Sequence, residues 1–300
     1  MQAALLSPRY WPTWLAMGIM RLLAWLPYSW GYAIGAGLGS LVRRLPVRFV
    51  AIARRNIELC LPELTLKASA NLLAQHFRSL GIAVCETALA WYAGDSKLRP
   101  LVHVRGSEHL QSALAQGKGV ILLAAHFTTL EIGARFCALQ WPINIVYRPS
   151  KNAVLSAFLA RQRAAQAKRA IRRDDIRSMI SALRSNEIVW FAPDQSYRKK
   201  GAQMVPFFGI PAATNPATSR LARMTGAAVL PYFVERQSQG KGYTVNIGAA
   251  LQQFPSEDPA ADALRVNVLI EAQVRRVPEQ YLWIHRRFKS VNPADPDRYA

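Results

Sequence analysis

Residues 119–136, GVILLAAHFTTLEIGARF, decide the fold expected of this chain. The apolar run from Val120 to Leu123 predicts a short strand that is buried on both faces, as in a parallel sheet covered by helices. His126 follows at the carboxyl end of this strand, where open α/β sheets place their reacting groups. A helix capped by Thr128 or Thr129 is expected next. The stretch therefore predicts an α/β domain with an imidazole at a strand end.

His126 and Glu131 are the candidate catalytic residues. Histidine is well suited to accept a proton from a hydroxyl near neutral pH. Within one helix, five residues would turn Glu131 about 140° away from His126, so the two can meet only if His126 lies in the turn before the helix. Thr128-x-x-Glu131 also matches a capping box, in which the glutamate bonds back to the helix start. The residues alone leave both interpretations open.

The rest of the chain alternates as an α/β domain should. Strands are expected over residues 143–147, 188–191, 228–233 and 243–247, and helices over residues 152–169, 174–185, 216–225 and 260–276. Residues 66–93 are expected to form one or two further helices. No internal repeat divides the sequence, so we predict one catalytic domain over residues 46–300, with a central, mostly parallel or mixed sheet flanked by helices.

The N-terminal residues 1–45 are expected to anchor the chain to a membrane. Residues 22–42 carry no charge, and this length can cross a hydrocarbon layer of about 30 Å as a helix. Half of the eight tryptophans lie in the first thirty residues, as expected near a membrane interface. Pro27 and the glycines at 31, 35 and 39 also suit an interfacial or re-entrant segment, and these glycines make a smooth face for helix packing.

Basic residues gather after this segment. Five arginines lie between residues 43 and 55, against two before residue 22, which predicts a catalytic domain on the cytoplasmic side. The formal net charge of +20 points to anionic partners. The chain has no zinc-finger spacing, RNP pattern or basic zipper, so we expect an anionic membrane surface and no nucleic acid as partner.

Other chemistries lack their motifs. There is no Gly-x-Ser-x-Gly elbow, and the glycine-rich pieces do not follow a strand in the way a phosphate loop would. We therefore expect no cofactor. The histidines show no metal-ligand spacing, so no metal is expected. Cys60, Cys85 and Cys137 lie far apart in expected helices and are predicted to be reduced core residues.

Six blocks follow one another in an order that resembles the late acyltransferases of lipid A biosynthesis. They are HFTTLE at 126–131, VYRPSKN at 146–152, VWFAPDQ at 189–195, VPFFGIPAAT at 205–214, LARMTGAAVLPYFVER at 221–236 and PEQYLWIHRRFK at 278–289. The resemblance covers nearly the whole chain.

This resemblance implies a reaction and a location. The reaction would be an O-acyl transfer from an acyl carrier protein thioester to a hydroxyl of a lipid A precursor, at the bacterial inner membrane. His126 would be the general base, with Glu131 orienting or supporting the imidazole. Backbone N–H groups near the helix entrance would stabilise the oxyanion. The acidic carrier protein and the lipid precursor would be the partners.

The resemblance also implies substrate-binding residues. Arg148 and Arg173 suit acceptor phosphates or sugar carboxylates, while most of the basic residues between 161 and 177 are expected on solvated helix faces. Asp194 is predicted to order the site through hydrogen bonds, or alternatively to cap a turn. Apolar residues of the 205–210 and 281–285 blocks would line an acyl groove or pack in the core.

Two alternatives to a lipid A acyltransferase remain at this stage. The same chemistry can act on another membrane lipid, of ornithine or glycerol type, or the chain can be a noncatalytic basic membrane-binding protein. The length of the acyl chain, the acceptor hydroxyl, its sugar requirement and the oligomeric state cannot be read from the sequence.

Overall fold

The structure, a computed structural model, describes residues 3–290 and 297–299. The predicted N-terminal segment and catalytic domain also include residues 1–2, 291–296 and 300, which lie outside the described residues. The helices are α1 Trp11–Leu23, α2 Tyr28–Val42, α3 Arg48–Cys60, α4 Leu66–Tyr92, α5 Asp95–Leu98, α6 Ser107–Ala115, α7 Leu130–Gln140, α8 Ala153–Gln166, α9 Ile176–Arg184, α10 Ala217–Thr225 and α11 Pro259–Arg276. The strands are β1 Val102–Arg105, β2 Val120–Leu123, β3 Ile143–Tyr147, β4 Arg169–Arg172, β5 Ile188–Phe191, β6 Gln203–Phe207, β7 Ile210–Thr214, β8 Ala228–Arg236 and β9 Tyr243–Ile247.

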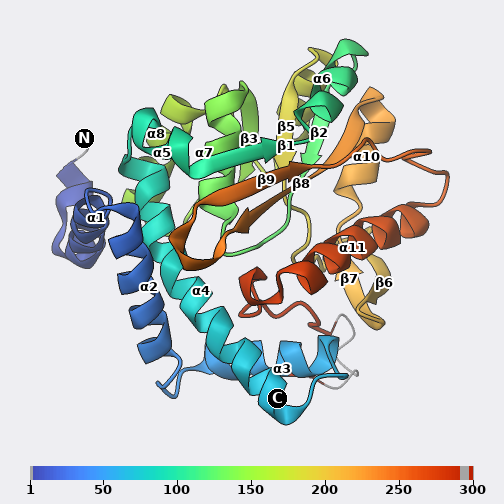
Figure 1. Cartoon of the computed structure of the whole chain (residues 1–300). Helices are drawn as coiled ribbons and strands as arrows, with labels where there is room; N and C mark the ends of the chain where they lie inside the picture. The colour runs from blue at the N-terminus through green and yellow to red at the C-terminus, as the bar shows by residue number, and fades with distance from the viewer. Residues whose placement is uncertain (1–2, 291–296, 300) are drawn as a thin grey trace.

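A mixed sheet forms the centre of the described chain (Figure 1). Its strand order is β1-β9-β8-β2-β5-β3-β4. The strands from β8 through β2, β5 and β3 to β4 run parallel, whereas β8 and β9 run antiparallel. The predicted α/β fold with a mostly parallel, mixed sheet is therefore confirmed, and β2 lies in its middle.

Strand β2 is buried on both faces. Its successive side chains point to opposite sides of the sheet, so they enter two different core clusters. Ile121 and Leu123 belong to a core cluster that includes residues of α3, α9, α10 and α11. Val120 and Leu122 belong to a second cluster that includes residues of α6 and α7. An uninterrupted apolar run is thus what a central strand between two helical layers requires.

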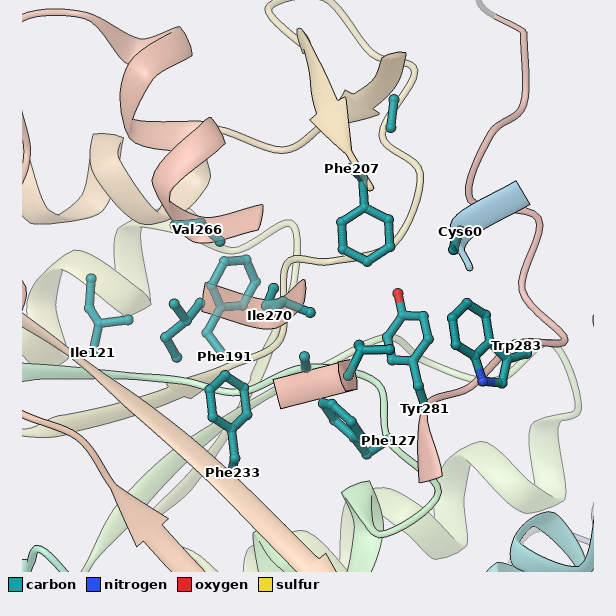
Figure 2. Close-up of a cluster of buried hydrophobic side chains, with 14 of the residues drawn as sticks. Cys60, Ile121, Phe127, Phe191, Phe207, Phe233, Val266, Ile270, Tyr281 and Trp283 are labelled. Carbon is teal, nitrogen blue, oxygen red and sulfur yellow. The ribbon is translucent and has the colours of Figure 1, made fainter. Parts of the chain in front are cut away.

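The first cluster continues past the strand ends toward the C-terminal part of the chain (Figure 2). The ring of Tyr281 lies 5.5 Å from that of Phe127, 6.0 Å from that of Phe207 and 5.0 Å from that of Trp283, measured between centroids. All four side chains are buried. Aromatic packing therefore fixes the segment around Tyr281 against the turn that follows β2.

The predicted N-terminal membrane helix over residues 22–42 is not supported by the structure. Two shorter helices, α1 and α2, occupy this region and are separated by residues 24–27. Pro27 is the N-cap residue of α2. A single helix cannot easily continue through this position, because proline has no N–H to donate and its ring clashes with the preceding helical turn. Among the described helices, none combines the length and apolar character needed to cross a membrane.

The glycine face predicted on this segment packs as expected. Gly35 and Gly39 of α2 lie directly against the backbone of α4, and a Cβ built on Gly39 would come within 1.9 Å of the carbonyl oxygen of Phe77. Gly81 of α4 meets the backbone of α2 in the same way. Helices α2 and α4 therefore approach more closely than side chains would allow.

Some elements were not predicted. Strand β4 interrupts the region expected to be two consecutive helices, because four residues are too few to show a period. The block at 205–214 forms the hairpin β6–β7, and its two-residue turn at Phe208 and Gly209 has positive φ angles of 51° and 72°.

Candidate active site

The imidazole of His126 lies between the end of β2 and the start of α7, in contact with Asp194. His126 Nδ1 is 2.6 Å from Asp194 Oδ1, and the backbone N–H of His126 donates to Asp194 Oδ2 at 3.0 Å. Asp194 follows β5, which pairs in parallel with β2, so both residues leave the same edge of the sheet at neighbouring strand ends. One carboxylate therefore holds both the ring and the backbone of His126.

The charge of Asp194 sets the tautomer of His126. The Asp194 side chain is only 2% exposed, and burial alone would raise the pKa of its carboxyl group, but attraction to His126 and hydrogen bonds from it hold that pKa below its ordinary value. An ionised carboxylate only accepts hydrogen bonds, so Nδ1 carries the proton of the neutral ring and Nε2 carries the lone pair. Within residues 3–290 and 297–299, Nε2 has no hydrogen-bond partner, and the His126 side chain is 22% exposed.

A segment near the C-terminus holds the turn that carries His126. The N–H of Leu282 donates to the carbonyl oxygen of His126 at 3.0 Å, and the N–H of Thr128 donates to the carbonyl oxygen of Gln280 at 2.7 Å. Phe127 and Tyr281 form an isolated antiparallel bridge between these bonds. The HFTTLE and PEQYLWIH blocks, about 150 residues apart in the chain, thus share one piece of backbone structure.

The hydrogen bonds of this turn limit which backbone N–H groups are available to form an oxyanion hole. Four backbone N–H groups already donate within the protein, those of His126, Phe127, Thr128 and Leu130. The N–H of Gly133 also donates, to the carbonyl oxygen of Thr129. The remaining candidates at the helix entrance are the N–H groups of Thr129, Glu131 and Ile132.

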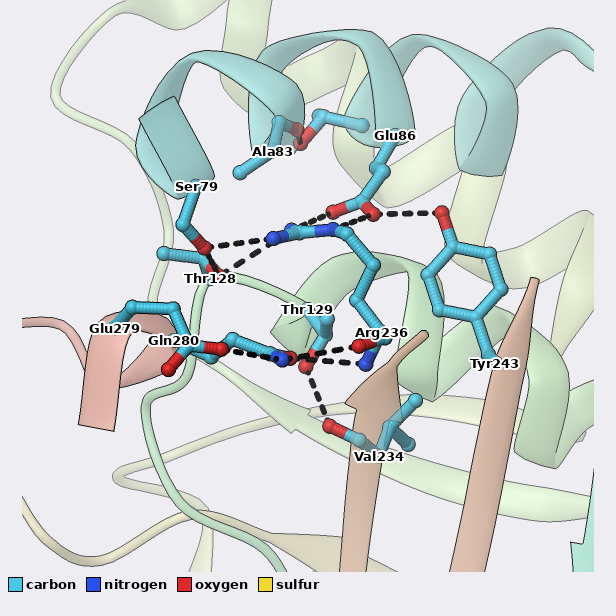
Figure 3. A network of polar contacts seen from close by, with 11 residues as sticks. Ser79, Ala83, Glu86, Thr128, Thr129, Val234, Arg236, Tyr243, Glu279 and Gln280 are labelled. Atoms are coloured by element: carbon cyan, nitrogen blue, oxygen red, sulfur yellow. Dashed lines mark hydrogen bonds and ion pairs between the residues drawn. The ribbon is translucent and has the colours of Figure 1, made fainter. Parts of the chain in front are cut away.

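Behind the turn, a buried ion pair links α4 to the end of β8 (Figure 3). The guanidinium of Arg236 contacts both carboxylate oxygens of Glu86, and the hydroxyl of Tyr243 donates to Glu86 at 2.6 Å. The same guanidinium donates to Ser79 Oγ at 2.6 Å and to Thr128 Oγ1 at 3.3 Å. Burial opposes the charge of Arg236, but Glu86 outweighs burial and raises the pKa of Arg236 above its ordinary value. A fixed cation therefore lies beside the candidate active-site turn.

The contacts of Glu131 are with residues other than His126. Its carboxylate accepts a hydrogen bond from Trp91 Nε1 at 2.9 Å and lies 3.4 Å from a guanidinium nitrogen of Arg163. The carboxylate that contacts the imidazole is that of Asp194, so any orienting or supporting role of Glu131 does not run through a hydrogen bond to the ring. The capping-box alternative is wrong as well, because Thr129 is the N-cap of α7 and no side chain caps this helix start.

Arg148 and Arg173 lie next to each other at the same edge of the sheet. Each follows the last residue of its strand, β3 and β4, and the N–H of Arg173 donates to the carbonyl oxygen of Tyr147. Both side chains are exposed. The carboxyl ends of β2, β5, β3 and β4 therefore carry His126, Asp194, Arg148 and Arg173 in spatial order.

The sequence did not reveal the buried polar residues around this edge. Most basic residues between 161 and 177 were expected on solvated helix faces. Arg163 differs, because only 15% of its side chain is exposed and its guanidinium lies 5.0 Å from the centre of the Tyr147 ring. Glu86 did offer a signal, since it is the single acidic residue of α4 and lies in an apolar run. Its partner Arg236 ends an apolar strand and had no comparable signal.

Most residues considered for an acyl groove belong to the core. Val205, Phe207, Tyr281 and Trp283 are buried, so core packing, the alternative given above, describes them. A small apolar hollow lies at the His126 turn. It is lined by Ala124, Ala125, Phe127, Thr129, Leu130, Gly133, Trp190, Tyr232, Phe233 and Val234.

The described residues contain no group of three or more His, Cys, Asp or Glu side chains that could hold a metal ion. Cys60, Cys85 and Cys137 are free and buried, as predicted. The chemistry available at the sheet edge is therefore that of a carboxylate-supported imidazole flanked by arginines.

Comparison with known proteins gives this geometry its family. The family model for bacterial lipid A biosynthesis acyltransferases matches residues 1–290. The chain belongs to this family. It is 38% identical to the lipid A biosynthesis lauroyltransferase of Escherichia coli (strain K12), over 99% of this chain and 97% of that protein.

Two further relatives widen the comparison within the lipid A acyltransferases. The palmitoleoyltransferase of the same organism is 39% identical over 95% of this chain and 93% of its own length. The myristoyltransferase is 27% identical over 97% and 91%. These relatives are named for three different acyl groups, so membership of the family alone does not fix the acyl chain that this acyltransferase transfers.

Proposed function

We propose that this acyltransferase moves a fatty acyl chain from an acyl carrier protein thioester to a hydroxyl of a lipid A precursor, with His126 as the general base. The observation that carries the proposal is the contact of His126 Nδ1 with the buried carboxylate of Asp194, which leaves Nε2 as the basic nitrogen. A thioester is already activated, so positioning and a proton acceptor suffice for transfer.

The proposed reaction has two steps. The acceptor hydroxyl gives its proton to His126 Nε2 while its oxygen bonds to the thioester carbonyl carbon, which forms a tetrahedral intermediate. Collapse of the intermediate then breaks the carbon–sulfur bond, and the leaving thiolate takes the proton back from the imidazolium. Asp194 stabilises the imidazolium between these steps and keeps the ring in its tautomer.

The other predicted residues have supporting roles in this scheme. Arg148 and Arg173 bind anionic groups of the acceptor, since exposed guanidinium groups form forked hydrogen bonds with phosphate. Glu131 acts at one remove from the imidazole, by holding Trp91 and Arg163 beside the site. The small apolar hollow next to the turn is proposed to receive part of the acyl chain.

We place the reaction at the cytoplasmic face of the bacterial inner membrane. The arginines that follow the N-terminal segment and the lipid nature of the acceptor support this location. The acidic carrier protein would approach from the aqueous side, steered by the positive charge of the chain.

The function is tested in cells that lack the protein. Mass spectrometry of their lipid A should show a species short of one acyl chain, and wild-type protein should restore it. The variant His126→Ala, produced at the same level, should not restore it. Lipid A with its full set of acyl chains in the deletion strain would refute the proposed acceptor.

A further inference from the structure

The outer faces of α1 and α2 carry the same pattern of exposed apolar side chains. In α1 they are Trp11, Leu15, Ile19 and Leu22, and in α2 they are Trp30, Ile34, Leu38 and Leu41. Both sets have the spacing i, i+4, i+8, i+11, which keeps them on one face of a helix. With Trp25 between the helices, these side chains are 39% to 71% exposed. Exposed apolar stripes of this size mark a surface that binds a membrane or another protein.

The inner faces of the two helices are already occupied. Gly35 and Gly39 hold α2 against α4, which is itself tied to the body by the Glu86–Arg236 ion pair. Tyr10, which precedes α1, and Met17 of α1 pack with Val154 of α8. Figure 1 shows α1 and α2 on the same outer side of α4. Each helix therefore has one side against the protein, and neither helix is free to be surrounded by lipid.

The charge around the stripes selects an anionic lipid surface. Residues 1–57 contain seven arginines and no aspartate or glutamate. Of these arginines, Arg9 and Arg21 border α1 or lie in it, and Arg44 and Arg48 follow α2; all four are exposed. Exposed tryptophans at positions 11, 25 and 30 have the apolar ring and polar N–H that favour the boundary between lipid chains and headgroups.

We propose that α1 and α2 lie in the plane of the membrane and embed in a single leaflet, with the two stripes among the upper lipid chains and the arginines at the phosphates. The stripes would then sit about 5–10 Å below the headgroups, as interfacial helices do. This binding mode does not depend on the reaction assigned above, so either proposal can fail without the other.

Depth measurements on the full-length protein test this mode. Single cysteines introduced as Leu15→Cys and Leu38→Cys are labelled with a nitrobenzoxadiazole fluorophore; the native cysteines are buried and serve as the unlabelled background. The labelled proteins are bound to phosphatidylethanolamine–phosphatidylglycerol vesicles that carry a nitroxide at carbon 5 or carbon 12 of a lipid chain. Leu66→Cys and Val268→Cys, which replace exposed apolar residues of the body, are the controls.

Both helix labels should be quenched more by the shallow nitroxide than by the deep one, and to the same depth, while neither control label is quenched. A label at Leu38 that is quenched mainly at carbon 12 would show that α2 crosses toward the bilayer centre and would overturn the proposal. Unquenched helix labels in a dimeric protein would assign the stripes to a second copy and overturn it too.

The charge requirement is tested separately by flotation with the same vesicles. The double variant Arg44→Glu/Arg48→Glu should bind about tenfold more weakly or worse, because each basic residue near an anionic leaflet contributes to binding. Lys118→Glu, at an exposed position outside this region, should bind within about twofold of wild type. Equal binding of all three proteins would refute the role of the arginines.

Discussion

At the scale of single residues, two histidines show how position decides chemistry. His126 has a partly exposed ring against the carboxylate of Asp194, whereas His76 is completely buried on α4. Burial lowers the pKa of His76 to about 4, and the hydrogen bond to the carbonyl oxygen of Glu279, which acts in the opposite direction, does not offset this effect. The same side chain is thus a candidate base at a strand end and a neutral core residue on a helix.

The buried His76 makes stability depend on pH. Its folded pKa of about 4 lies below the unfolded value of 6.5, so the unfolded chain binds the proton first as the pH falls. Stability should therefore decrease from pH 6.5 toward pH 4, by up to about 3 kcal/mol for this group. His76→Gln keeps a hydrogen-bond donor and removes the titration. Its melting temperature, followed by circular dichroism, should fall less steeply over this range than that of wild type; parallel curves would contradict this expectation.

Asp194 is predicted to act through the tautomer of His126. In Asp194→Asn the amide can donate to Nδ1, which moves the ring proton to Nε2 and removes the base. The rate of acyl transfer should drop by about 10²- to 10⁴-fold at neutral pH. The pKa of Asp194 is held below its ordinary range, so wild type keeps the charged partner throughout mildly acidic conditions. A single-turnover assay that finds the variant within threefold of wild type would remove Asp194 from the mechanism.

At the scale of elements, the ion pair between Glu86 and Arg236 joins helix α4 to strand β8. Removing one partner of a buried pair leaves an uncompensated charge, so Glu86→Gln should lower the free energy of unfolding by about 3–5 kcal/mol. Glu63 provides the matched control, because its ion pair with Arg275 is about half exposed. Glu63→Gln should cost less than about 1 kcal/mol. Denaturant titration in detergent measures both, and equal losses would refute the structural role of the pair.

The packing of α2 on α4 offers a second matched pair of variants. A Cβ on Gly39 would collide with the backbone of α4, whereas a Cβ on Gly37 meets nothing within 4 Å. Gly39→Ala should therefore destabilise the protein by about 1–3 kcal/mol through forced separation of the helices. Gly37→Ala should be neutral or stabilise it by up to about 1 kcal/mol, because alanine favours the helix. Thermal unfolding of both variants measures these changes, and a Gly39→Ala variant as stable as wild type would contradict the close packing.

The elements that could be predicted from sequence are those whose pattern is local. Strands β3, β5 and β9 begin and end at the predicted residues, because each is a short run rich in β-branched and aromatic residues. Strand β4 was missed, since its pairing with β3 is decided by tertiary contacts and not by its own four residues. The single helix expected over residues 22–42 is divided into two, because Pro27 imposes a break that hydropathy does not register.

At the scale of the whole molecule, the site is a product of topology. The sequence indicated His126, Asp194, Arg148 and Arg173 one by one, and parallel strand order brings them to one edge of the sheet. The partner of the imidazole could not be chosen from spacing, because Glu131 is near in sequence while Asp194 lies 68 residues further on, after β5. The buried pair behind the turn required contacts between α4 and β8 that no local pattern encodes.

The most direct test of the whole account is the rate of a single acyl transfer by purified His126→Ala, with acyl carrier protein thioester as donor and a lipid A precursor as acceptor. Loss of the base should slow transfer by about 10²- to 10⁴-fold, and the variant should stay folded, because the imidazole is partly exposed and Asp194 still accepts the backbone N–H of residue 126. A variant that folds normally and transfers the chain at the wild-type rate would contradict the assignment of His126 as general base.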